Sequence, residues 1–118
     1  MWERNQKTLK KEVSFSGVGL HSGINVDVTL IPANSNSGII FKRTDLKKNN
    51  EIIANFKNVS SAKLCTKIEN DFGTSVSTIE HLMAAFYICG IDNIVVNLNG
   101  PEVPIMDGSA KDFVQIIK

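Results

Sequence analysis

Histidine and cysteine are scarce in this chain, and its net charge is close to zero. The low net charge and the low cysteine count each exclude a class of protein. The 118 residues include two His and two Cys, and 13 Lys and Arg against 12 Asp and Glu give a net charge of +1. A chain so close to neutral lacks the strong attraction that binding to nucleic acid or to an anionic membrane requires. Two cysteines form one disulfide at most, so we expect no disulfide framework, and we expect reduced thiols in a cytoplasmic protein.

Long apolar runs are also missing. The longest one extends from Leu82 to Cys89, which is far short of the ~18 residues that a transmembrane helix needs. Residues 1–12 contain no apolar stretch of the kind found in a signal peptide. Because 42% of the residues are hydrophobic, the composition is that of a globular protein. We therefore expect one cytoplasmic domain over residues 1–118.

Alternating apolar residues predict several β-strands. The clearest signal covers residues 24–31, where Ile24, Val26, Val28 and Leu30 share one face. Weaker strand signals cover residues 8–16, 38–43, 52–54, 62–68 and 92–99. The glycine-rich residues 17–23 predict a loop between the first two strands, and residues 70–73 predict a turn.

Two helices are predicted late in the chain. The first covers residues 78–89 and has apolar side chains at helical spacing, namely Ile79, Leu82, Met83 and Phe86. Ser77 is its expected N-cap, and Gly90 is its expected stop. A second helix begins near Ser109, and its pattern still continues at Lys118, so we expect the chain to be part of a longer protein. Strands without regular βαβ alternation predict an α+β fold, with one largely antiparallel sheet layered with helices on one face.

Glu80 and His81, in the first turn of the first predicted helix, are the strongest candidates for chemistry. A neutral imidazole is a good zinc ligand, and a neighbouring carboxylate can take a proton from water. A structural role is the alternative, because residues 77–80 (STIE) match a capping box in which Glu80 only satisfies a backbone donor. A catalytic zinc ion needs three protein ligands, and the chain contains neither H-E-x-x-H nor C-x-x-C.

Three further residues have weaker claims. His21 lies in the glycine-rich loop, where functional residues often concentrate; the alternative is that the glycines serve only a wide hairpin connection. Cys65 is expected to be a buried, inert thiol. Residues 101–109 contain two prolines and end in a turn at Asp107, which a connector between sheet and helix is enough to explain.

Four segments together resemble one enzyme family. They are residues 17–23 (GVGLHSG), 77–82 (STIEHL), 90–94 (GIDNI) and 104–109 (PIMDGS). Their types and order resemble the N-terminal half of UDP-3-O-acyl-N-acetylglucosamine deacetylase, the bacterial zinc enzyme of lipid A biosynthesis. The resemblance runs from about Thr8 to the end of the chain. It implies the first of two similar α+β domains, which face each other across a site that hydrolyses the N-acetyl group of a UDP-linked acylated N-acetylglucosamine and releases acetate.

The resemblance also implies roles for individual residues. His81 would be a zinc ligand, and Glu80 would be the general base. The other matched positions would line the substrate side (Leu64, Cys65 and Thr66), lie on a loop near the site (His21) or support the structure (Asp107). The family's remaining zinc ligands, a His and an Asp of the second domain, have no counterpart here, and neither does the second-domain histidine that assists the reaction. We therefore expect the chain alone to be inactive and to bind zinc weakly or not at all.

Two other interpretations remain open at the level of sequence. One is a non-catalytic α+β binding or interaction domain, in which Glu80 only caps a helix and His81 is a surface residue. The other is an unrelated zinc hydrolase that uses His21, His81 and a carboxylate within this chain. A His-x-x-x-Asp on a predicted helix downstream in the gene would favour the deacetylase, whereas a closed three-ligand site within this chain would favour the unrelated hydrolase.

Overall fold

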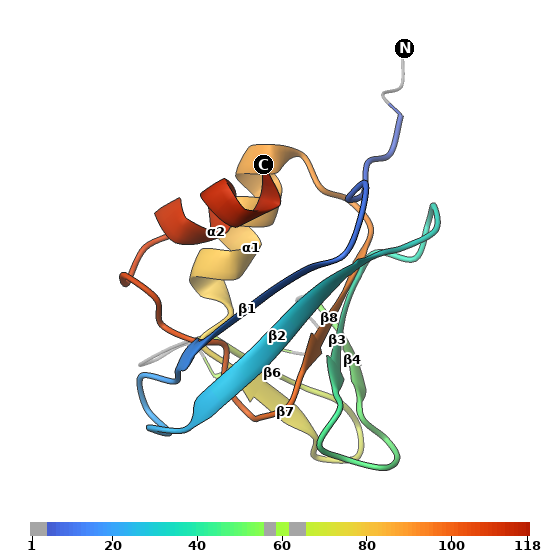
Figure 1. Cartoon of the computed structure of the whole chain (residues 1–118). Helices are drawn as coiled ribbons and strands as arrows, with labels where there is room; N and C mark the ends of the chain where they lie inside the picture. Colours follow the sequence, from blue (N-terminus) through green and yellow to red (C-terminus); the bar gives the residue numbers. More distant parts are fainter. Residues whose placement is uncertain (1–4, 56–58, 62–65) are drawn as a thin grey trace.

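The computed structural model describes residues 5–55, 59–61 and 66–118 (Figure 1). Its ten elements, in chain order, are β1 (Val13–Val18), β2 (Asn25–Pro32), β3 (Ile39–Arg43), β4 (Glu51–Ile53), β5 (Val59–Ser61), β6 (Lys67–Glu69), β7 (Ser75–Ser77), α1 (Glu80–Cys89), β8 (Ile94–Leu98) and α2 (Lys111–Ile117). In this described part of the chain, no helix is long and apolar enough to cross a membrane.

The larger sheet has five strands in the order β1-β2-β8-β3-β4. The β3–β8 pairing is parallel, whereas the other three pairings are antiparallel. In β2 the alternation predicted from the sequence is present, because Val26, Val28 and Leu30 are fully buried while Asn25 and Asp27 are exposed. These side chains form the sheet's contribution to the hydrophobic core.

Both helices lie over the same face of this sheet (Figure 1). From α1, Leu82, Ala85 and Phe86 are buried, and from α2 Phe113 is buried. The Phe113 ring packs on Phe15 of β1 with a centroid separation of 5.4 Å. The α+β class and the layer of helices on one face are thus confirmed.

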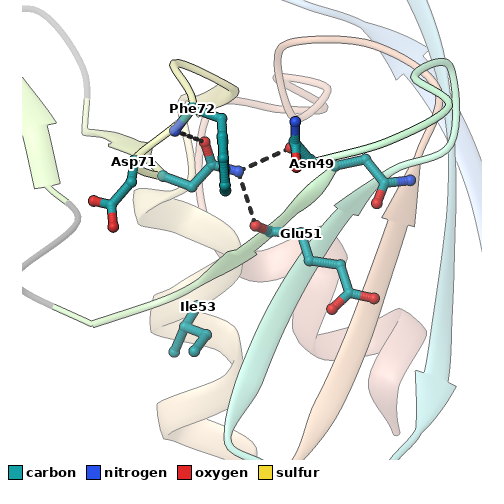
Figure 2. A pocket seen from close by; sticks show the side chains of 7 residues that line it. Asn49, Glu51, Ile53, Asp71 and Phe72 are labelled. Atoms are coloured by element: carbon teal, nitrogen blue, oxygen red, sulfur yellow. Dashed lines mark hydrogen bonds between the residues drawn. The ribbon is translucent and has the colours of Figure 1, made fainter.

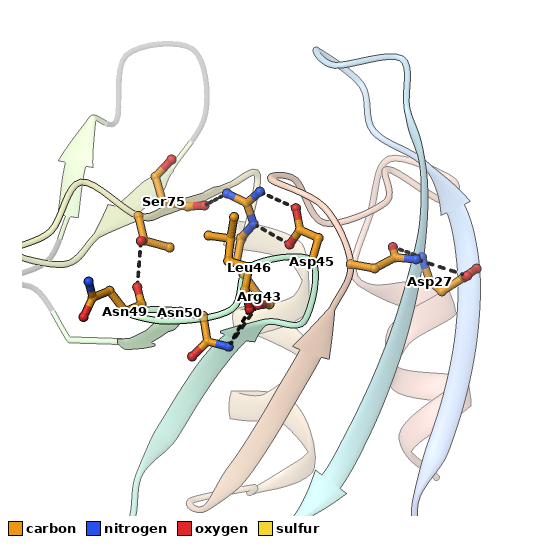
Figure 3. A network of polar contacts seen from close by, with 9 residues as sticks. Asp27, Arg43, Asp45, Leu46, Asn49, Asn50 and Ser75 are labelled. Atoms are coloured by element: carbon orange, nitrogen blue, oxygen red, sulfur yellow. Dashed lines mark hydrogen bonds and ion pairs between the residues drawn. The ribbon is translucent and has the colours of Figure 1, made fainter.

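A second sheet, of three short antiparallel strands in the order β5-β6-β7, was not predicted as a separate unit. It is joined to the first sheet by polar contacts near the turn at residues 70–73. The amide of Asn70 donates to the carbonyls of Asn49 and Glu51 at 2.9 and 3.1 Å (Figure 2). Thr74 donates its hydroxyl to the Asn49 carbonyl at 2.7 Å, and Arg43 donates to the Ser75 carbonyl at 3.2 Å (Figure 3).

The start of α1 differs from the prediction. Ser77 is the last residue of β7 and not an N-cap, and the helix begins at Glu80 after Ile79, with no side-chain cap. The Ser77 N–H donates to the Pro101 carbonyl at 2.8 Å, and its own carbonyl accepts from the Val103 N–H at 3.1 Å. The capping-box interpretation of residues 77–80 is therefore wrong, because pairing with the segment after β8 places Ser77 in extended backbone.

The end of α1 is as predicted. Gly90 adopts a left-handed conformation with φ of 72°, and its N–H bonds to the carbonyls of Phe86 and Tyr87. The second helix begins at Lys111, two residues after the predicted start, and the Ser109 hydroxyl accepts the Lys111 N–H at 3.2 Å.

Candidate functional site

Glu80 is the first residue of α1, and its carboxylate is held at one oxygen only. Oε2 accepts a hydrogen bond from the backbone N–H of Thr66 at 3.0 Å. The carbonyl of Thr66 in turn accepts the N–H of Ile79 at 3.3 Å, so the residue before β6 is fastened to the start of the helix. Oε1 is buried and has no hydrogen-bond partner among the described residues. A buried carboxylate oxygen without a donor is costly unless a ligand or water satisfies it.

Glu80 and Thr66 share a cavity of about 360 Å³. Apart from Glu80, Thr66 and Asn55, its lining is apolar. It comes from β5, β6, α1, the residue before α1 and the residue after β4, namely Val59, Ile68, Met83, Ile79 and Ala54. The structure therefore brings together two of the predicted site residues. Leu64 and Cys65, predicted to lie on the same side of the substrate, fall outside the described residues.

His81 follows Glu80 in the first turn of α1 and is half-buried. Imidazole nitrogen is a ligand that zinc accepts, and a neighbouring carboxylate can take a proton from water, so the pair fits one side of a zinc site. No group of three or more His, Cys, Asp or Glu side chains that could hold a metal ion occurs within the described residues. The unrelated hydrolase with a complete zinc site in this chain therefore finds no support in the part that the structure describes.

His21 does not reach this cavity; its loop is instead tied to Glu102, a residue that sequence analysis missed. The His21 side chain is exposed, and its backbone N–H lies 3.0 and 3.1 Å from the two Glu102 oxygens. The Ser22 N–H donates to Oε1 at 2.8 Å, and the Thr78 hydroxyl donates to Oε2 at 2.5 Å. His21, Ser22 and Glu102 also line a small cavity of about 250 Å³.

Glu102 is only 2% exposed. Burial alone would raise the pKa of this carboxyl, but the hydrogen bonds from the Thr78 hydroxyl and from the N–H groups of Ser22 and His21 outweigh it and lower the pKa below its ordinary value. Glu102 is therefore ionised at neutral pH. The only sign of it in the sequence is an acidic residue between Pro101 and the apolar Val103-Pro104 pair. A simple connection between sheet and helix does not need an acidic residue there.

Asp107 lies in the exposed turn before α2. Its carboxylate accepts from the Ser109 hydroxyl at 2.8 Å and from the Ser109 N–H at 3.0 Å. These two bonds are the main reason that the pKa of Asp107 is lowered. The contacts are those of a side chain that orders a turn.

The cavity in Figure 2 is larger, about 490 Å³, but it contains none of the predicted site residues. It lies between the 49–53 segment and the 70–72 turn, and its lining includes the exposed ring of Phe72 and the carboxylates of Glu51 and Asp71. Cavity volume is therefore a poor guide here, and the chemistry of the lining favours the smaller cavity at the start of α1.

Comparison with known proteins adds an independent finding. The model of the UDP-3-O-acyl N-acetylglycosamine deacetylase family matches residues 6–118. The chain is 55% identical to the UDP-3-O-acyl-N-acetylglucosamine deacetylase of Geotalea uraniireducens, over 96% of this chain and 36% of that protein. It is 50% identical to the enzyme of Blochmanniella pennsylvanica and 49% identical to that of Aliivibrio fischeri, over 38% and 37% of their lengths.

The chain thus spans little more than a third of the relatives that it matches. The family match, in contrast, extends from the segment before β1 to the last residue of the chain. It includes the glycine-rich loop, the Glu80–His81 pair and Asp107. The chain belongs to the UDP-3-O-acyl N-acetylglycosamine deacetylase family.

Proposed function

We propose that this chain is one domain of a zinc-dependent deacetylase that removes the N-acetyl group of UDP-3-O-acyl-N-acetylglucosamine and releases acetate in lipid A biosynthesis. In this proposal Glu80 is the general base and His81 is a zinc ligand. The observation that carries the proposal is the pair of inequivalent oxygens of Glu80, one bonded to Thr66 and one buried without a donor in the described structure.

The geometry suits Glu80 to proton transfer. Thr66 N–H fixes the carboxylate through Oε2, which leaves Oε1 to accept a proton from an attacking water. The proton would then pass to the amine that leaves as the acetamide C–N bond breaks, so that acetate and a free 2-amino group are the products. General-base assistance of this kind contributes about 10²–10⁴ in rate.

His81 would hold the zinc ion next to this base. When bound, zinc supplies a Lewis acid that polarises the acetamide carbonyl and lowers the pKa of water. The described residues offer no set of three ligands, so the remaining ligands would come from the rest of the enzyme. We therefore propose that the 118-residue chain has no activity by itself.

The face of α1 that points away from the core favours a further contact. Tyr87 is 88% exposed and Ile88 is 62% exposed, so two adjacent large side chains near the end of α1 face solvent. We propose that the second domain of the same enzyme covers them. We also propose a cytoplasmic location, where thiols stay reduced.

The experiment that tests the proposal replaces Glu80 by Gln in the protein expressed from its full natural reading frame. The amide oxygen of Gln still accepts the Thr66 N–H, but the side chain no longer takes a proton. Acetate release should fall by about 10²–10⁴-fold, while zinc content measured after dialysis stays the same.

Glu12→Gln is the matched control, because Glu12 is an exposed carboxylate just before β1 and does not line the cavity at the start of α1. It should retain the full rate. An unchanged kcat in Glu80→Gln would refute the role of Glu80 as the base. Glu80 would then only hold Thr66 against the start of α1.

A further inference from the structure

Glu102 is a buried carboxylate that the proposed reaction does not use. Its two oxygens accept from three groups on two separate segments: the N–H groups of His21 and Ser22 in the loop between β1 and β2, and the hydroxyl of Thr78 between β7 and α1. Charged, buried and fully occupied by donors, it joins these segments more firmly than a neutral side chain would.

Thr78 is the point at which this contact meets the candidate site. It is 4% exposed and has a φ of 61°, a left-handed conformation that a β-branched residue rarely adopts. Such a conformation persists only where the surroundings enforce it. Here the Glu102 carboxylate holds the Thr78 hydroxyl, and the pairing of Ser77 with Pro101 and Val103 holds the residue before it.

The loop fits closely around the carboxylate. A Cβ atom on Gly19 would lie 2.4 Å from Oε1 of Glu102 and 2.5 Å from the hydroxyl of Ser22. The Gly19 N–H also bonds to the Ile24 carbonyl, and its own carbonyl accepts from the Gly23 N–H, each at 3.0 Å. The close approach of the Glu102 carboxylate therefore leaves no room for a side chain at Gly19.

We propose that Glu102 is a positioning residue, which locks the 19–23 loop and Thr78 into one arrangement and thereby sets the direction of the first turn of α1. That turn carries Glu80 and His81, two and three residues beyond Thr78. A displacement of about 1 Å at a reacting group is enough to cost about 10²-fold in rate. The effect on turnover rests on the proposed function, whereas the attachment of the 19–23 loop and Thr78 to Glu102 does not.

The test compares Thr78→Val, which removes only the hydroxyl and keeps the β-branched shape, with Thr78→Ser, which keeps the hydroxyl. Both are made in the protein expressed from its full natural reading frame. For Thr78→Val we expect kcat to fall about 10- to 100-fold, with KM and zinc content little changed. Thr78→Ser should restore most of the rate. Hydrogen exchange of peptides covering residues 19–23 and 78–81 should accelerate in Thr78→Val and not in Thr78→Ser.

A second variant, Glu102→Gln, keeps the shape of the side chain and one carbonyl oxygen but loses the charge, so we expect an intermediate fall in kcat and intermediate exchange. It decides the outcome if Thr78→Val does not fold. Glu12→Gln again serves as the control, with unchanged kcat and exchange.

Full kcat in the variants, even with a lowered unfolding temperature, would overturn the proposal, because Glu102 would then be structural only. If the wild-type protein releases no acetate, the proposed function fails. The exchange measurement then still tests whether Glu102 holds the 19–23 loop and Thr78 in place. In that case, unchanged exchange at residues 19–23 and 78–81 in both variants would overturn it.

Discussion

At the scale of single residues, the candidate site depends on contacts between side chains and backbone groups of different elements. Glu80 and His81 stand out because histidine is scarce and the pair lies at the predicted start of a helix. The partner of Glu80 is the backbone of Thr66, which belongs to a different element, and no periodicity links the two. Glu102 was missed for the same reason, since its donors lie in the loop between the first two strands and at the start of α1.

The two histidines should behave differently toward zinc. In the protein expressed from its full reading frame, His81→Ala should lose most of its zinc on dialysis, because an imidazole ligand is removed. His21→Ala should keep its zinc, since His21 contacts Glu102 through its backbone N–H, which alanine retains. Metal analysis of both variants after dialysis checks this prediction. Equal loss in the two variants, or retention in His81→Ala, would contradict the assignment of His81.

At the scale of elements, the longer strands and helices could be predicted from the sequence, and the second sheet of three-residue strands could not. The alternation in β2 and the apolar spacing in α1 extend over eight and ten residues, and both elements were expected close to where they lie. The strands β5, β6 and β7 have three residues each, and Ser75–Ser77 contains one apolar residue. Such short strands show no period, so the second sheet depends on tertiary contacts that local patterns do not contain.

Asn70 is the side chain that should matter most to the attachment of the second sheet. Its amide donates to two carbonyls of the 49–51 segment (Figure 2). Its Oδ1 accepts the N–H groups of Phe72 and Thr74. Asn70→Ala should lower the free energy of unfolding by about 1–3 kcal/mol, because backbone groups lose their partners. Chemical denaturation measures the change.

The neighbouring Asp71→Ala is the control for Asn70→Ala. The Asp71 side chain is exposed, and its removal should change the free energy of unfolding by no more than about 0.5 kcal/mol. Equal effects of the two substitutions would show that the Asn70 contacts add nothing specific to the junction.

At the scale of the whole molecule, Glu102 makes stability depend on pH. Its pKa is lower in the folded chain than its ordinary value of 4.5, so the unfolded state binds protons more readily and acid favours unfolding. The stabilisation is present above about pH 4.5 and is lost as the pH falls through the folded-state pKa. Asp45, bonded to Arg43, shifts in the same direction.

Thermal unfolding measured from pH 7 to pH 3 tests this. The wild-type chain should lose stability below pH 4.5, and Glu102→Gln should show a shallower loss over the same range while being less stable at pH 7. Parallel curves for the two proteins would mean that Glu102 titrates in the folded state as it does in the unfolded one.

In the proposed enzyme, this chain carries the base and one ligand of a zinc site that the rest of the protein completes. Zinc content and acetate release, measured side by side on the 118-residue chain and on the protein from the full reading frame, test this proposal. We predict about one zinc ion per molecule and turnover of UDP-3-O-acyl-N-acetylglucosamine for the full-length protein, and neither for the chain alone. Stoichiometric zinc with turnover in the 118-residue chain, or a full-length protein with neither, would contradict the claim.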